Sequence, residues 1–136
     1  MTKAYLTELT YKIIGAAIEV HKILGPGLLE SVYHQCLAHE FALQGIAFRS
    51  EMYIPVYYKD IEVETHFRCD FLVEDAIVVE IKAIEAVLPI HVAFLMNYMK
   101  LLENPKGIMI NFHCVNLFKE GQKTYVNQQY RNLPDE

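Results

Sequence analysis

Four charged side chains between residues 66 and 83 are of the types that hydrolytic sites use. The segment, HFRCDFLVEDAIVVEIKA, contains two apolar runs separated by Glu74 and Asp75, which predicts a β-hairpin. The charged side chains alternate with apolar ones: Arg68, Asp70, Glu80 and Lys82. Paired carboxylates can bind Mg²⁺, which prefers oxygen ligands. An adjacent lysine could hold an attacking water or a developing negative charge.

The length of the loop decides which side chains of this hairpin share a face. A two-residue loop pairs Val73 with Ala76 and mixes polar and apolar side chains on both faces. A three-residue loop, 74–76, pairs Val73 with Ile77 and gives one apolar face: Phe67, Cys69, Phe71, Val73, Ile77, Val79, Ile81 and Ala83. Because a one-residue slip moves every side chain to the other face, burial should select the three-residue loop.

The selected register places Asp70 opposite Glu80 and Arg68 opposite Lys82. Like charges directly opposite each other destabilise a sheet by tenths to about 1 kcal/mol. Two neighbouring carboxylates also raise each other's pKa unless a cation lies between them, and a divalent metal would remove this conflict. Alternatively, Arg68 and Lys82 form diagonal ion pairs with the two acids on a solvated face, and no metal is bound.

Three helices are expected to position the hairpin. Apolar residues at intervals of three and four predict a helix over 6–24, which Gly25-Pro26-Gly27 ends, and a second helix that Gly45 ends. Pro89 can open a third helix that runs to about Leu102. Its apolar stripe would consist of Ile90, Phe94, Tyr98 and Leu101.

The remaining segments alternate as strands do. They are 52–58, where Pro55 marks an edge strand, then 61–73, 77–83, 107–112 and a last strand or hairpin within 115–126. The order of elements predicts an α/β fold, a mixed sheet flanked by helices. We expect one domain over residues 1–126 and a polar, frayed C-terminal tail over 127–136.

Composition and charge exclude several classes of protein. The 136 residues are 53% hydrophobic, which excludes disorder. Seventeen acidic and 12 basic residues give a net charge of −5, so any contact with nucleic acid must be local. No signal peptide or membrane span is recognisable, which predicts a cytoplasmic protein without membrane contact. Three widely spaced cysteines form no metal-binding pair and are expected to be reduced and buried.

Glu30, at the start of the second helix, allows two interpretations. With Gly27 as the N-cap, Glu30 would be the N3 residue of a capping box or would complement the helix dipole. Alternatively, Glu30 is a third carboxylate over the polar face of the hairpin.

Several motifs together resemble one family. Gly27-Leu28-Leu29-Glu30-Ser31-Val32-Tyr33 matches the GxxExxY signature of a branch of the PD-(D/E)XK nuclease-like superfamily. The other matching features are His21, Gly25, Pro26, Arg68-Cys69-Asp70, Val79 to Ala83, Asn97-Tyr98 and Ile110 to Phe112. The resemblance covers roughly residues 5–120. It implies a restriction-endonuclease-like αβββαβ core with an extra N-terminal helix.

The same resemblance implies roles for individual residues. Asp70 and Glu80 would be metal ligands, with the Ile81 carbonyl as a third, and Glu30 would complete the acidic site directly or through water. Lys82 would position or activate water. In active relatives, these groups hydrolyse a phosphodiester of DNA with Mg²⁺ or Mn²⁺. Accessory positions would be Arg68, His21, His91 and Tyr33.

One position departs from the family pattern. Similar sequences carry glutamine where this chain has Phe94, which removes a hydrogen-bond partner for water or phosphate, and His91 is a candidate replacement. The six histidines have no metal-binding spacing, so most should be structural. Five tyrosines could stack on bases, but packing at a sheet edge or in an oligomer contact is favoured. They are Tyr5, Tyr11, Tyr53, Tyr57 and Tyr58.

Two functional hypotheses follow. The first is a metal-dependent nuclease acting on DNA, with RNA as an open alternative substrate. The second is a catalytically inactive nuclease-like binding or interaction module, which the net charge of −5 and Phe94 favour. Since duplex cleavage by a small nuclease usually needs two sites, we expect a homodimer, with strand 52–58 and its tyrosines as the candidate surface.

Overall fold

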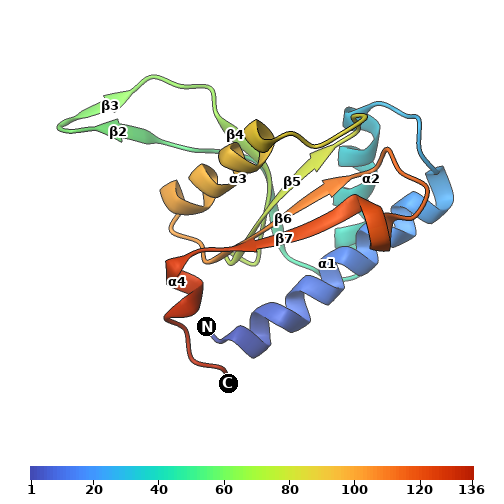
Figure 1. Cartoon of the computed structure of the whole chain (residues 1–136), viewed down its shortest axis with the longest axis horizontal. Coiled ribbons are helices and arrows are strands. Elements are labelled where there is room, and N and C mark those ends of the chain that lie inside the picture. The colour runs from blue at the N-terminus through green and yellow to red at the C-terminus, as the bar shows by residue number, and fades with distance from the viewer.

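The first two helices end as their glycines predict. The computed structural model describes all 136 residues and begins with α1 (Lys3–Leu24) and α2 (Glu30–Leu43) (Figure 1). Gly25 follows α1 with a φ of 69°, and its N–H donates to the His21 carbonyl at 2.7 Å. Gly45 lies just beyond α2 with a φ of 71°. These left-handed conformations favour glycine and confirm both predicted helix ends.

A five-stranded mixed sheet forms the centre of the molecule, in the order β1-β4-β5-β6-β7. Its strands are β1 (Phe48–Tyr53), β4 (Arg68–Val73), β5 (Ile77–Lys82), β6 (Lys106–Asn111) and β7 (Gln122–Val126). Only β5 and β6 pair in parallel, and α3 (Pro89–Leu101) connects them. This is an α/β architecture consistent with the restriction-endonuclease-like fold, so the predicted fold class is confirmed.

The predicted strand 52–58 is instead parts of two strands. Pro55 lies between β1 and β2 (Val56–Tyr58), and β2 pairs only with β3 (Ile61–Val63). Because proline lacks an N–H group, it interrupts the pairing that a continuous strand would need. The β2–β3 hairpin projects away from the sheet (Figure 1). The predicted strand 61–73 is likewise divided between β3 and β4.

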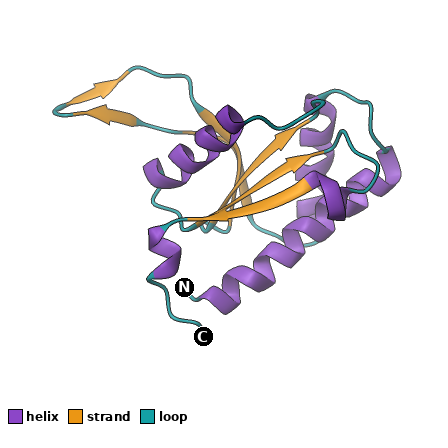
Figure 2. Ribbon diagram, in the orientation of Figure 1, coloured by secondary structure: helices purple, strands orange, loops and turns teal.

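Helices pack on both faces of the sheet (Figure 2). The core on one face joins α1 and α2 to apolar side chains of the central strands, among them Phe71, Val79, Ile81 and Ile110. The core on the other face joins Leu95 and Met99 of α3 to Cys69, Leu72, Val78 and Met109. The predicted apolar stripe of α3 is therefore wrong: Ile90 and Phe94 are exposed.

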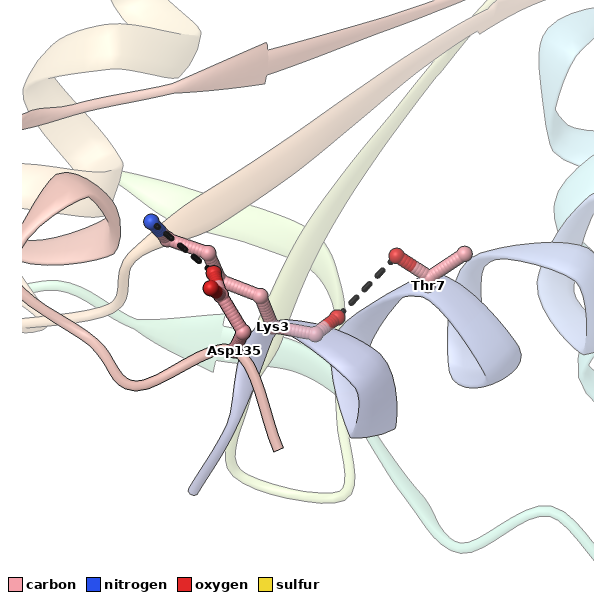
Figure 3. A network of polar contacts seen from close by, with 3 residues as sticks. All are labelled: Lys3, Thr7 and Asp135. Atoms are coloured by element: carbon pink, nitrogen blue, oxygen red, sulfur yellow. Dashed lines mark hydrogen bonds and ion pairs between the residues drawn. The ribbon is translucent and has the colours of Figure 1, made fainter.

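The C-terminal segment packs against the N-terminus. After β6, the chain passes through a short π-helix, η1 (Leu117–Gly121), and β7, and then forms α4 (Gln128–Arg131). The last residues return to α1, where the backbone N–H of Lys3 donates to the Pro134 carbonyl at 2.9 Å. Lys3 Nζ also lies 3.7 Å from Asp135 Oδ1, and the Lys3 carbonyl accepts from Thr7 Oγ1 at 3.0 Å (Figure 3). The end of the chain is thus held by contacts rather than frayed.

Candidate active site

The β4–β5 hairpin has the register that its apolar pattern predicts. Val73 pairs with Ile77, and Phe71 pairs with Val79. Two loop residues, Glu74 and Asp75, have left-handed φ angles of 51° and 52°. The three-residue loop is therefore confirmed, and it brings Asp70 and Glu80 to the same level of the two strands.

Asp70 and Glu80 interrupt the regular pairing at this level. Asp70 Oδ2 accepts a hydrogen bond from the Ile81 N–H at 2.8 Å, and Glu80 Oε1 accepts one from the Asp70 N–H at 3.1 Å. Each carboxyl group thus bonds to backbone of the opposite strand. Glu80 is only 7% exposed, and Asp70 is half-buried. Two acidic side chains are therefore held together at the edge of the core.

The alternation of side chains along β4 also breaks at Asp70. Phe71 packs under α1 and α2 as expected, but Cys69 packs in the core beneath α3. The Phe67 ring lies 6.2 Å from the ring of Tyr98, which belongs to α3. The expectation that Phe67 and Cys69 share a face with Phe71 is wrong. The physical reason is local: the Asp70 N–H bonds to the Glu80 side chain instead of to a backbone carbonyl of a neighbouring strand.

Glu80 retains a proton more strongly than an ordinary carboxyl group does. Burial, the negative charge of Asp70 and a hydrogen bond between the two carboxyl groups raise the pKa of Glu80 to about 9. Burial and the same two acids also raise the pKa of Tyr98, and they raise that of Cys69 to about 12. Glu80 is therefore protonated at neutral pH unless a cation takes the place of its proton.

No basic side chain forms an ion pair with these acids. Lys82 lies two residues beyond Glu80 at the end of β5 and is half-buried. The guanidinium carbon of Arg68 lies 4.8 Å from the centre of the Tyr53 ring, outside any ion pair. The two ion pairs of the chain are elsewhere: Lys3–Asp135 and Arg49–Asp75. The alternative of diagonal ion pairs across the hairpin is therefore wrong.

Glu30 contributes a third carboxyl group close to the pair. Leu29, rather than Gly27, is the N-cap of α2, and Glu30 is the first helical residue without a capping contact. The capping-box interpretation is therefore wrong. Burial and the charge of Asp70 raise the pKa of Glu30, whereas Lys82 acts in the opposite direction. Glu30 thus shares an electrostatic environment with residues of both hairpin strands.

Tyr33 fixes the loop that leads to Glu30. Its hydroxyl donates to the Gly25 carbonyl at 2.5 Å and accepts from the Leu28 N–H at 3.2 Å. Its ring is fully buried and stacks on Phe112, with 4.5 Å between ring centres. Tyr33 therefore holds the α1–α2 loop from within the core and makes its hydrogen bonds to Gly25 and Leu28 rather than to the acids.

Two cavities flank the Asp70–Glu80 pair. The polar cavity, of about 390 Å³, is lined by Glu30, Ser31, His34, Gln35, Glu51 and Asp70. The aromatic cavity, of about 290 Å³, is lined by Phe67, Glu80, Lys82, His91, Phe94, Tyr98 and Met109. A larger cavity of about 570 Å³ lies beside η1 and β7 and contains none of the four predicted catalytic residues. Asp70 thus lines the polar cavity and Glu80 lines the aromatic cavity.

Comparison with known proteins assigns the family. A sequence model described as the PD-(D/E)XK nuclease superfamily matches residues 7–124. The chain belongs to this superfamily. No curated protein and no solved structure gives a significant match. None of the helices of this PD-(D/E)XK protein combines the length and apolarity that a membrane span requires.

The accessory residues of this PD-(D/E)XK protein lie in different places. His91 lines the aromatic cavity, and its Nδ1 accepts from the Leu88 N–H at 2.9 Å. The other proposed histidine, His21, has its Nε2 2.8 Å from the Cys114 carbonyl oxygen, where it joins α1 to the segment after β6. Only His91 is brought beside Glu80 and Lys82.

Sequence reasoning missed several residues around the acids. Glu51 lies opposite Asp70 in β1, between the paired residues Ser50 and Met52, and has a left-handed φ of 51°. His34 Nε2 lies 3.3 Å from both the Asp70 carbonyl oxygen and Ser50 Oγ. Correct placement of β1 at 48–53 would have predicted Glu51 from the pairing alone. His34 lies one helical turn after Glu30 and therefore on the same side of α2, so the helix alone could have predicted that it lies near the acids.

The acidic residues of this PD-(D/E)XK protein are compatible with a magnesium site of the open kind. No three side chains of His, Cys, Asp or Glu come close enough to form a preassembled metal cluster. Mg²⁺, however, commonly uses one or two carboxylates together with substrate phosphate and water. The buried Glu80 carboxyl group and the neighbouring Asp70, neither of which has an ion-pair partner, offer oxygen ligands for such a cation, which would take the place of the Glu80 proton.

Proposed function

We propose that the protein is a metal-dependent nuclease that hydrolyses phosphodiester bonds, with DNA as the expected substrate. The observation that carries this proposal is the buried Glu80 carboxyl group, which is joined to Asp70 and has no cationic partner. A purely structural role would be better served by an apolar side chain at this position, because a buried acid without a cationic partner has to keep its proton. Membership of a nuclease superfamily supports the proposal.

Asp70 and Glu80 would hold Mg²⁺ or Mn²⁺, with the Ile81 carbonyl as a third ligand and Glu30 acting directly or through water. When bound, such a cation polarises a phosphoryl oxygen and lowers the pKa of bound water. The two backbone hydrogen bonds to Asp70 and Glu80 orient both carboxyl groups before the cation arrives. This preorganisation limits the entropy that the side chains lose when they bind.

Lys82 would orient the attacking water and stabilise negative charge on the reacting phosphate. It lines the same cavity as Glu80 and is half-buried, where a charge acts more strongly than it does in water. Because Lys82 is not committed to an ion pair, its ammonium group is available to a substrate. Arg68 would contact the nucleic acid backbone from the exposed end of β4.

The test is cleavage of a plasmid and of oligonucleotides by the purified chain with Mg²⁺ or Mn²⁺, with EDTA as a control. Lys82→Ala and Asp70→Asn should each reduce the rate by at least about a hundredfold, the scale of losing one group that stabilises charge. Lys22→Ala, an exposed lysine of α1, should cleave at the wild-type rate. Unchanged cleavage by the Lys82 variant would overturn the assigned role.

An inactive binding module on the same scaffold is the second candidate. The lack of a three-ligand metal cluster favours it, as does Phe94 in place of a polar residue. Thermal melting separates the two candidates, since a cation that binds the folded state raises the melting temperature by mass action. A melting temperature insensitive to Mn²⁺, together with no cleavage, would favour the inactive module.

We also propose that the chain belongs to the GxxExxY branch. In support, the motif's glutamate, Glu30, lies beside the acidic pair, and its tyrosine, Tyr33, holds the loop before it. Cytoplasmic placement is a further proposal, and three free cysteines are in keeping with it.

A homodimer remains our proposal for cleavage of both strands of a duplex. The candidate surface is β1, which is an edge strand, together with the exposed Tyr53, Tyr57 and Tyr58. Light scattering on the purified chain would measure its mass, and a Tyr57→Ser/Tyr58→Ser variant should shift a dimer toward the monomer. A monomeric wild-type protein at micromolar concentration would contradict this proposal.

A further inference from the structure

We infer that the aromatic cavity binds an unpaired base of the nucleic acid, next to the phosphate that is cleaved. The substrate class would then be single-stranded nucleic acid, or a duplex end whose terminal nucleotide has opened. This inference rests on the proposed function, because it takes the nearby hydrolytic groups as the place where the phosphate binds. It assigns a recognition role to Phe94 and Phe67.

The first argument is the composition of the cavity walls. Three six-membered aromatic rings border the cavity, and the ring of Tyr98 neighbours both of the others. The Tyr98 ring centre is 6.2 Å from that of Phe67 and 6.2 Å from that of Phe94, with interplanar angles of 46° and 44°. Stacking on such rings is independent of base identity, since every base has a π-face.

The second argument is the exposure of two of these rings. Phe94 is 44% exposed and Phe67 is 41% exposed, although both are large apolar side chains beside a cavity. Neither belongs to the two buried cores, so neither is needed to fill the interior. Apolar surface that remains open beside polar reactive groups is typical of a ligand-binding recess.

The third argument is the position of the hydrolytic groups in the same cavity. Glu80 and Lys82 line it together with the rings, and His91 lies on the α3 side. A phosphate beside Lys82 would therefore have its own nucleotide, or the adjacent one, within reach of Phe94. The rings of the aromatic cavity would bind the base and thereby hold the sugar–phosphate backbone in position.

The fourth argument concerns pairing and charge. Bases inside a duplex are stacked on each other, so their faces are not available to Phe94 or Phe67 without unstacking. The chain also carries a net charge of −5, and attraction to phosphates alone would give weak binding. Base stacking provides affinity that does not depend on a basic surface, and an unpaired base offers it at the lowest cost.

The experiment measures binding of three fluorescent DNA oligonucleotides in MgCl₂: a single strand, the same strand as a blunt duplex, and the single strand with abasic residues at every second position. The Lys82→Ala protein serves as the uncleaving form. We expect it to bind the intact single strand at least about fivefold more tightly than the abasic strand or the duplex. Phe94→Ala in this background should remove most of that difference.

The matched control is Phe118→Ala, a phenylalanine that is 60% exposed on η1 and does not line the aromatic cavity. It should leave all three affinities unchanged. Equal affinity for intact and abasic strands, including no measurable affinity for either, would overturn the inference. A base-dependent preference that Phe94→Ala does not reduce would also overturn it.

Cleavage measurements separate this inference from the proposed function. If the wild-type protein cleaves DNA but Phe94→Ala keeps the same ratio of rates on single strands and duplexes, the inference fails and the nuclease proposal stands. If no substrate is cleaved but single strands bind in a base-dependent way that Phe94→Ala weakens, the nuclease proposal fails and the base-binding cavity stands.

Discussion

Asp70 and Glu80 hold each other in place through the backbone of the opposite strand. The Ile81 N–H donates to Asp70 Oδ2 at 2.8 Å, and the Asp70 N–H donates to Glu80 Oε1 at 3.1 Å. Each acid therefore replaces a backbone partner that regular strand pairing would provide. The consequence is that two carboxyl groups stay close together despite their repulsion, and this proximity contributes to the raised pKa of Glu80.

The first prediction concerns stability and pH. Because the pKa of Glu80 is about 9 in the folded protein and near 4.5 in an ordinary glutamate, the folded state keeps a proton that the unfolded chain has lost. The contribution of Glu80 to the free energy of unfolding should thus be highest below about pH 4.5. It should fall as the pH rises toward 9, by up to about 1.4 kcal/mol per pH unit. Urea denaturation at pH 6, 7 and 8 measures this slope.

Glu80→Gln should flatten that slope, since glutamine keeps the acceptor for the Asp70 N–H but cannot ionise. It should also be more stable than the wild type at pH 8 without metal. Glu8→Gln, an exposed glutamate of α1, is the control and should keep the wild-type slope. Identical slopes for all three proteins would contradict a proton held at Glu80.

The second prediction is that metal binding and proton release are linked. A cation that uses Asp70 and Glu80 must displace the proton that Glu80 holds, because only the ionised carboxylate is a good ligand. The apparent affinity for Mn²⁺ should therefore rise about tenfold per pH unit between pH 6 and 8. Calorimetry in two buffers of different ionisation enthalpy should count about one proton released per metal.

Asp70→Asn should abolish this Mn²⁺ binding, whereas Asp60→Asn, at the exposed β2–β3 turn, should not change it. An affinity that is the same at pH 6 and pH 8 would place the metal away from Glu80. Removal of the metal by EDTA should return the wild-type protein to the melting temperature it has without added cation.

The third prediction concerns Tyr33, whose hydroxyl bonds to Gly25 and Leu28 in the loop before Glu30. Tyr33→Phe keeps the ring stacked on Phe112 but leaves two backbone groups without this partner. We expect a loss of about 1–2 kcal/mol in urea denaturation. The rate of cleavage at 20 °C should fall by more than the fraction of protein that unfolds, because the loop before Glu30 is no longer held. Tyr11→Phe, on the exposed side of α1, should change neither quantity.

The register of the β4–β5 hairpin followed from the sequence because every second side chain of its two strands from Phe71 to Ile81 is apolar and these side chains pack together in one core. A slip by one residue in either strand would have put Phe71 on the opposite face from Val79 and Ile81, so only one loop length kept this apolar set together. The helix ends followed from Gly25 and Gly45, whose left-handed φ angles few other residues adopt. In both cases the residue types within one segment were sufficient to predict its structure.

Other features depended on contacts between distant segments. The alternation of side chains along β4 breaks at Asp70, where the hydrogen bonds of Asp70 and Glu80 join the two strands. The pattern of apolar residues within β4 alone could not have predicted these bonds. Nor does the α3 sequence distinguish the buried pair Leu95 and Met99 from the exposed Ile90 and Phe94, since all four are apolar. The choice is made by the sheet beneath α3, where Gly107 leaves room for Leu95 and Met99.

The fourth prediction tests this close packing of α3 on β6. A Cβ atom on Gly107 would lie 2.6 Å from Met99 Sδ and 2.9 Å from Leu95 Cδ1, closer than side-chain atoms tolerate. Because Met99 and Leu95 are fully buried and have little room to move, Gly107→Ala should displace both side chains and the part of α3 that carries them, at a cost of about 1–3 kcal/mol in the free energy of unfolding. Since α3 carries His91 and Phe94, the aromatic cavity should widen and cleavage should fall.

Two further variants separate the clash at position 107 from the effect that a glycine-to-alanine change has on stability in general. Gly15→Ala, in α1 with no atom within 4 Å of the new Cβ, should stabilise the protein by about 0.5–1 kcal/mol, since alanine favours the helix over glycine. In the double variant Gly107→Ala/Met99→Ala, the shortened side chain should relieve the clash, so its cost should be smaller than the sum of the two single costs. Strictly additive costs would mean that α3 does not depend on the absence of a side chain at Gly107.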